Sequence, residues 1–157
     1  MKLPFGNPST TPAQDIVLLA ARLALGTVMI AHGWQKLDQG GLGGTADGFG
    51  AMGIPLAPAA AAFAIALELG GGVLILLGAL TPLVGVLWAL HMAGAWWFVH
   101  RDAFFVADGG YELVLVLGAL GLVLASTGPG RLSVDHLLTR QLTRQREEER
   151  QPETVAV

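Results

Sequence analysis

The chain has 157 residues, of which 53% are hydrophobic and only 13% charged, and its mean hydropathy is +0.58. Soluble domains carry about 25% charged residues, so this composition indicates an integral membrane protein. Cysteine is absent, which excludes disulfides, thiolate metal sites, iron–sulfur clusters and thiol catalysis. The net charge of −3 gives no indication of nucleic-acid binding. Any redox chemistry must therefore use a bound cofactor.

Four apolar segments are long enough, or nearly so, to cross a bilayer, which takes about 20 helical residues. They are residues 16–37, 57–80, 83–99 and 112–127. The first is not a cleavable signal peptide, because Arg22 interrupts it and no small-residue cleavage site precedes a polar chain. We therefore predict an all-α integral membrane protein, an antiparallel four-helix transmembrane bundle. The bundle takes up residues 15–130, between a short segment at 1–14 and a polar tail at 131–157.

The connections between these segments are uneven. Residues 38–55 are rich in glycine and predict a long loop, whereas Thr81-Pro82 predicts a tight turn. The segment HRDAFFVADGGYE mixes polar and aromatic residues, which indicates a loop at the membrane surface. After TGPGR, the tail predicts an amphipathic helix capped by Ser133 or Asp135.

The distribution of lysine and arginine predicts the orientation. Lys2 precedes the first apolar segment, and Lys36 and Arg101 fall on the opposite side of the bundle. Five arginines follow the last apolar segment: Arg131, Arg140, Arg144, Arg146 and Arg150. By the positive-inside rule, both termini are then cytoplasmic. Trp34, Trp96 and Trp97 fall near the outer boundary, as an aromatic belt would.

Charged side chains within a membrane are costly and need partners. Placed by depth at about 1.5 Å per residue, Arg22, Glu68 and His91 fall in one layer toward the cytoplasmic side. We expect Arg22 and Glu68 to form an intramembrane ion pair, with His91 as a hydrogen-bonding companion. Such a layer either fixes the packing of the helices or handles protons or substrate.

A second polar layer lies toward the outer surface. His32 and Lys36 are one helical turn apart and share a face, and Glu112 lies at comparable depth. If these side chains converge beneath GFGAMGIP, they form a small polar pocket for a quinone headgroup or for proton transfer; otherwise they are a solvated interface cluster. We expect no metal site, and haem is disfavoured because His91 and His100 point to opposite faces of one helix.

In their order and spacing, five segments of the chain resemble the DoxX family of small bacterial four-span membrane proteins. These segments are RLALGTVMIAHGWQKL, GFGAMGIPLAP, ALELGGGVLILLGALTP, LHMAGAWWFVH and GGYELVLVLGALGLVLASTGPGRLSVD. The resemblance covers Asp15 to His136. The family pattern falls on Arg22, His32, Gly33, Lys36, Glu68, Tyr111 and Glu112. The resemblance implies a location in a bacterial plasma (inner) membrane. It also implies a redox setting, because relatives have been associated with thiosulfate-to-quinone electron transfer and with membrane complexes against oxidative stress.

Three hypotheses for the function follow. The chain is the membrane subunit, itself catalytic or not, of a quinone-linked redox or oxidative-stress complex. Alternatively, it is a non-enzymatic scaffold that anchors soluble partners through its tail and loops, or a small proton-coupled transporter that uses the inner charged layer. The expected partners are the lipid bilayer, soluble redox enzymes or further copies of the chain. Quinone is the expected cofactor, bound without a covalent link.

Overall fold

The computed structural model describes residues 10–150, with side chains described as far as Glu147. The start of the predicted N-terminal segment and the end of the predicted tail, 1–9 and 151–157, lie outside the described residues. Within residues 10–150 the chain forms helices and their connections, without a strand. The predicted all-α fold class is therefore confirmed.

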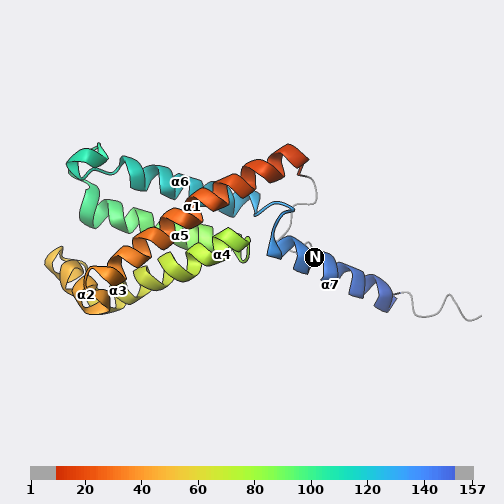
Figure 1. The fold of residues 1–157 in the computed structure, drawn as a ribbon, viewed down its shortest axis with the longest axis horizontal. Coiled ribbons are helices and arrows are strands. Elements are labelled where there is room, and N and C mark those ends of the chain that lie inside the picture. The colour runs from red at the N-terminus through yellow and green to blue at the C-terminus, as the bar shows by residue number, and fades with distance from the viewer. Residues whose placement is uncertain (1–9, 151–157) are drawn as a thin grey trace, which may run out of the picture.

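The helices follow one another along the chain with few intervening residues. They are α1 (Pro12–Asp38), α2 (Gly41–Ala51), α3 (Ala57–Ala66), η1 (Leu67–Gly71), α4 (Gly72–Leu77), α5 (Thr81–Ala95), η2 (Trp96–His100), η3 (Val106–Asp108), α6 (Glu112–Thr127) and α7 (Val134–Arg150). Both η1 and η2 are π-helices that continue the preceding α-helix, and η3 is a single 3₁₀ turn. The bundle consists of α1, of α3 with η1 and α4, of α5 with η2, and of α6. Helix α7 projects from one end of it (Figure 1). We refer to the two ends as the α2 end and the α7 end.

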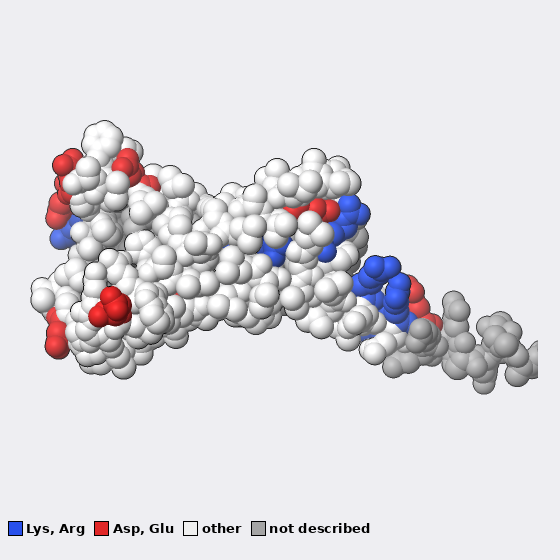
Figure 2. Space-filling view, in the orientation of Figure 1, with Lys and Arg blue, Asp and Glu red and all other residues white. Residues whose placement is uncertain are grey.

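The exterior of the bundle is that of a membrane protein. Three helical segments of the described chain are long and apolar enough to cross a membrane, Pro12–Asp38, Ala57–Leu77 and Thr81–His100, and α6 is a shorter apolar helix. Large apolar side chains such as Leu90, Leu115 and Val116 are more than half exposed on the outside of the bundle. Figure 2 shows charged side chains gathered at the two ends, with a wide middle section almost free of them. Lipid is the environment that such a surface requires.

The turn between α4 and α5 differs from the prediction. Thr81 and Pro82 form the first turn of α5, and the chain reverses earlier, at Gly78 and Leu80, whose φ angles are 67° and 52°. Proline suits the first helical turn because the N–H that it lacks has no helical partner there. Glycine at 78 supplies the left-handed conformation without strain.

Residues 38–55 are not the long loop that their glycines predict. Gly40 and Gly41 turn the chain with φ angles of 144° and 63°, and the following residues form α2. This helix packs against α3 and, less closely, against α1. None of its residues is buried, so α2 covers the bundle end as a separate, shallow layer.

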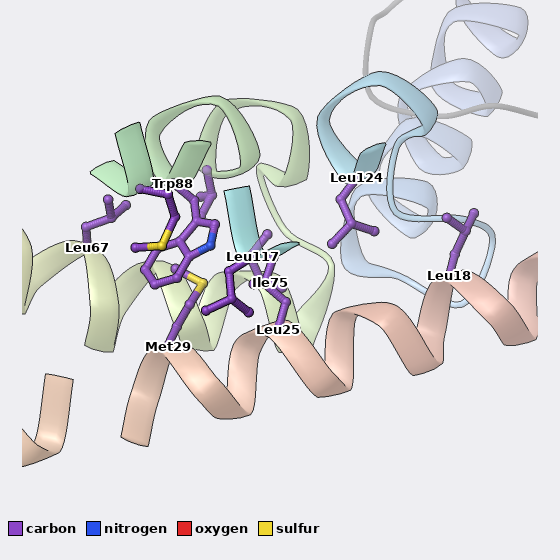
Figure 3. Packing of buried hydrophobic residues seen from close by; sticks show 10 residues of the cluster. Leu18, Leu25, Met29, Leu67, Ile75, Trp88, Leu117 and Leu124 are labelled. Carbon is purple, nitrogen blue, oxygen red and sulfur yellow. The ribbon is translucent and has the colours of Figure 1, made fainter. Parts of the chain in front are cut away.

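The core is a chain of apolar side chains along the bundle axis. Met29 of α1, Trp88 of α5 and Leu117 of α6 pack together at its centre (Figure 3). Small residues bring the helices close in two places. A Cβ atom at Gly26 would lie 2.8 Å from the carbonyl oxygen of Gly72, and one at Gly85 would lie 2.5 Å from that of Gly121. Close backbone approach at small residues is typical of membrane helices.

Candidate functional site

Three side chains from three helical segments meet at a buried carboxylate toward the α2 end. Lys36 Nζ lies 2.8 Å from Glu68 Oε1 and 2.7 Å from Oε2, and His91 Nε2 lies 3.0 Å from Oε1. The Glu68 side chain is 3% exposed, whereas Lys36 and His91 are 24% and 15% exposed. We call Lys36, Glu68 and His91 the Glu68 triad. The predicted contact between Glu68 and His91 is present.

Local helix geometry brings these groups together. Lys36 stands in the last turn of α1, where the helix dipole favours a cation. Glu68 belongs to the π-helix η1, a widened turn that is frequent at functional sites. Gly33 lets α1 approach this turn, because a Cβ atom there would lie 2.8 Å from Leu69 Cγ and 3.0 Å from Glu68 Cβ.

Aromatic rings border the triad. The ring centroid of His91 is 5.5 Å from that of Trp88 and 6.2 Å from that of Phe63. Trp88 is buried in the core, whereas Phe63 is 48% exposed on the outside of the bundle. The imidazole therefore lies between a core residue and a residue of the lipid-facing surface.

The triad is electrically balanced. A buried carboxylate is costly unless it is paired and hydrogen-bonded, and Glu68 receives both a cation and an imidazole. The ammonium of Lys36 has three N–H donors, and two of them point to the two oxygens of Glu68. Within residues 10–150, His91 forms its one hydrogen bond through Nε2. Within the same residues, one donor of Lys36 and the Nδ1 atom of His91 have no hydrogen-bond partner.

The predicted ion pair between Arg22 and Glu68 is wrong. Arg22 lies 14 residues before Lys36 on α1, or about 21 Å along the helix axis. The predicted layer requires all apolar segments to end at the same level in the membrane. In the structure, α1 extends past the end of α4 by several turns. The turn at Gly78 is level with Arg22, since a Cβ atom at Gly78 would collide with Arg22 Nη1. The predicted layer of Arg22, Glu68 and His91 is therefore divided between two sites.

Arg22 instead closes the α7 end of the bundle. Its guanidinium is fully buried and donates from Nη1 to the carbonyl oxygen of Leu76 at 3.2 Å and from Nη2 to that of Leu132. Leu76 lies in the last turn of α4, whose carbonyl groups lack helical partners. The charge of Arg22 thus joins α1 to α4 and to the segment that precedes α7.

Two carboxylates complete this connection. Asp15 Oδ2 accepts from Arg131 Nε at 2.7 Å and Oδ1 accepts from the Arg131 backbone N–H at 2.8 Å. Asp135 accepts from the backbone N–H groups of Leu80 and Thr81 at 2.9 and 3.2 Å. We call Asp15, Arg22, Arg131 and Asp135 the clamp.

The sequence analysis did not predict the clamp. The clamp changes two predictions about the tail: which helix Asp135 caps, and where the bundle ends. Asp135 caps α5 and not the tail helix, whereas Ser133 Oγ accepts from the His136 backbone N–H at 3.2 Å at the start of α7. Ser133 and Asp135 are 7% and 5% exposed, so the chain is still part of the bundle after residue 131. The available signal was an aspartate at the start of the first apolar segment and a TGPGR motif at the end of the last, which an antiparallel bundle places at one end.

The predicted outer layer does not assemble. Lys36 pairs with Glu68, and Glu112 Oε1 accepts from the backbone N–H of Val106 at 2.8 Å. His32 is half-buried and forms no hydrogen bond within residues 10–150. The structure therefore brings one member of this layer, Lys36, to the Glu68 triad and leaves His32 and Glu112 apart from it. In the described part of the chain, no group of three or more His, Asp or Glu side chains could hold a metal ion.

The fold and the site together define the class: a helical membrane protein whose bundle holds a buried Lys–Glu–His triad and is clamped to the start of α7. The DoxX family model matches residues 17–101, a range that includes all three residues of the triad. The chain belongs to the DoxX family. No solved structure matches it with significance.

Relatives match over most of the chain. "Putative oxidoreductase CatD" of Bacillus subtilis (strain 168) is 36% identical over 121 residues, which are 77% of this chain and 86% of the relative. "Inner membrane protein YqjF" of Escherichia coli (strain K12) is 36% identical over 138 residues, 82% of this chain and 96% of the relative. "Inner membrane protein YphA" of the same organism is 32% identical over 132 residues, 78% and 91% of the two chains. These names, together with the apolar helices, place the protein in a membrane.

Proposed function

We propose that this protein is the membrane component of a quinone-linked redox complex and that the Glu68 triad receives the quinone headgroup. The observation that carries the proposal is the buried carboxylate of Glu68 between two side chains with free nitrogen positions, Lys36 and His91. The name of the relative CatD, which describes an oxidoreductase, agrees with a redox role.

The chemistry of a quinone suits this set of groups. A quinone carbonyl accepts hydrogen bonds, and the third N–H of Lys36 can donate one. Nδ1 of His91 donates only in the imidazolium form; in the neutral form that donates to Glu68 through Nε2, Nδ1 is an acceptor and suits a quinol hydroxyl. Reduction to the quinol adds two electrons and two protons to the quinone. A reduced soluble partner supplies both electrons and is itself oxidised. Lys36 or His91, in its protonated form, gives a proton to each carbonyl oxygen and is reprotonated from water, while the ionised carboxylate of Glu68 stabilises the protonated donor. Phe63, which lies beside His91 and is 48% exposed, offers an apolar face to the ring.

The proposal includes a bacterial plasma-membrane location with both termini in the cytoplasm. Arg131, Arg140, Arg144 and Arg146 lie at the α7 end, and basic residues concentrate on the cytoplasmic side of membrane proteins. Because the chain lacks cysteine, single introduced cysteines report the orientation directly. Cysteine at Gly43, where a side chain meets no neighbour within 4 Å, should react with a membrane-impermeant maleimide in whole cells. Cysteine at Thr143 should react only after lysis, and the reverse pattern would contradict the orientation.

Quinone binding can be tested on the purified protein. In mild detergent, mass spectrometry should find quinone with the wild-type protein and much less with Lys36→Met. Arg101→Met is the matched control, because Arg101 is also a cation of this bundle end but its side chain is 55% exposed and outside the triad. A wild-type protein that neither retains quinone nor binds added quinone would refute the proposal.

A scaffold role is the second candidate, and α7 is the observation that favours it. Leu137, Leu138 and Leu142 are about half exposed on a helix that also carries Arg140 and Arg144. A soluble partner that co-purifies in fixed proportion with a quinone-free protein would support this role. The transporter hypothesis is weaker, because it relied on Arg22, Glu68 and His91 in one layer.

A further inference from the structure

Helix α7 presents three exposed leucines beyond the end of the bundle. Leu137, Leu138 and Leu142 are 58%, 52% and 48% exposed, and at about 100° per residue they share one side of the helix. Gln141 interrupts this side, so it suits the boundary between lipid headgroups and hydrocarbon better than the hydrocarbon itself. A cluster of exposed leucines indicates a surface that binds a partner.

Arginines flank the leucine side of α7. Arg140 and Arg144 are one turn apart along one edge of it, Arg146 lies on the other edge, and all three are exposed. No acidic residue stands between Asp135 and Glu147, and the carboxylate of Asp135 is bound to the first N–H groups of α5. These turns of α7 are therefore positively charged and suit an anionic partner.

The first turn of α7 lies at the level of a membrane boundary. The exposed Trp97 is 16 residues, or about 24 Å, from Thr81 along α5 and η2. Tryptophan marks the boundary of a hydrocarbon core about 30 Å thick, so the opposite boundary is about 6 Å beyond Thr81. Asp135 contacts the Thr81 N–H at 3.2 Å, which places the next residues of α7, Leu137 and Leu138, at that boundary.

Helix α1 indicates the same boundary independently. Ile16 and Val17 are 64% and 66% exposed and lie about 8 Å beyond Arg22 along α1. Arg22 is level with Gly78, whose carbonyl oxygen accepts from the Asp135 N–H at 3.0 Å. Exposed apolar side chains of α1 and of α7 thus extend to similar distances past this level.

We propose that the first turns of α7 bind anionic phospholipid. Leu137, Leu138 and Leu142 enter the headgroup boundary, and the guanidinium groups of Arg140 and Arg144 bind phosphate oxygens, which they can contact through paired N–H donors. The level of the helix favours lipid over a soluble protein, because a soluble partner would have to enter the bilayer to reach the first two leucines. This inference does not depend on quinone binding.

Single cysteines in the cysteine-free chain can report where the two sides of α7 lie. Leu142→Cys is on the leucine side, and Thr143→Cys, one residue further on the opposite side, is the matched control; both positions are exposed, so neither change should affect folding. Each full-length variant carries a nitroxide spin label and is placed in nanodiscs of phosphatidylcholine, with or without phosphatidylglycerol. Electron paramagnetic resonance then compares collisions of the label with oxygen, which concentrates in lipid, and with a neutral water-soluble nickel complex.

With phosphatidylglycerol present, the label at Leu142 should collide mainly with oxygen and the label at Thr143 mainly with the nickel complex. Replacing Arg140 and Arg144 by glutamine should lower the ratio of surface-bound to detached α7 about 30-fold, since each arginine near an anionic surface contributes about a factor of five. Arg101→Gln removes an exposed cation from the α2 end and should leave this ratio unchanged.

Three results would overturn the inference. Equal access of the nickel complex to both labels in phosphatidylglycerol nanodiscs would show that water surrounds α7. Protection of Leu142 that depends neither on phosphatidylglycerol nor on the two arginines would show apolar contact without an anionic-lipid site. Protection that arises only when the soluble cell fraction is added would show that a protein covers the leucines, as the scaffold role requires.

Discussion

The two ends of the bundle use buried charge in different ways. In the clamp, charged side chains bind mainly backbone groups: Arg22 binds the carbonyl oxygens of Leu76 and Leu132, and Asp135 binds the N–H groups of Leu80 and Thr81. In the Glu68 triad, each hydrogen bond joins two side chains. Backbone partners are fixed by the helices, whereas paired side chains can rearrange around a ligand. The comparison supports a structural role for the clamp, and the proposed function gives the triad the chemical role.

The largest effect on stability is expected at Arg22. Arg22→Leu leaves the two carbonyl oxygens without donors and removes the positive charge near Asp135, and we expect the free energy of unfolding to fall by about 3 to 5 kcal/mol. Titration with a denaturing detergent measures this change. Because Arg22 and Glu68 are not in contact, the effects of Arg22→Leu and Glu68→Leu should add within about 0.5 kcal/mol. If the double variant is instead more stable than the sum of the two effects predicts, Arg22 and Glu68 interact after all, and the two ends of the bundle are not independent.

A smaller loss of stability is expected for the triad, and it should be reversible. Lys36→Met leaves a buried carboxylate, but Lys36 is 24% exposed, so water reaches the site and the expected cost is about 1 to 3 kcal/mol. Adding Glu68→Leu should recover most of this loss, since an apolar pair can replace a buried ion pair nearly neutrally. Quinone binding should stay lost in the double variant. Recovery of binding together with stability would show that the triad only supports packing.

The apolar segments allowed the fold to be predicted, because hydrophobic length and composition determine membrane helices almost alone. The candidate site was predicted only in part. Glu68 and His91 were placed together, but the residue that pairs with Glu68 is Lys36 and not Arg22. The cause is the stagger of α1 against α4, which depends on close contacts such as Gly26 with Gly72 and on where the chain turns at Gly78. Hydropathy carries no information about this stagger.

The clamp was not predicted for a related reason. The sequence places Arg131 and Asp135 in the polar tail and Asp15 at the very start of the bundle, before the first apolar segment, and side chains in such positions are usually solvated. Asp15 and Asp135 are 5% exposed because α1 extends beyond α4 and the chain after α6 folds back over that end. Their partners are mostly backbone N–H groups, and pairing of residue types along the sequence cannot reveal such partners.

The smallest effect that still separates the two ends is expected at Asp135. Asp135→Ala removes the acceptor for the first N–H groups of α5, and loss of a helix cap costs about 1 to 2 kcal/mol. Asp108→Ala, at an exposed aspartate of the loop at the α2 end, is the control and should change stability by less than about 0.5 kcal/mol. The affinity for quinone should be the same in both variants and the wild type, because the clamp holds the helices at the end remote from the triad. A loss of quinone affinity in Asp135→Ala, measured at a temperature where the variant is fully folded, would show that the clamp sets the position of His91 through α5 and that the two ends act together.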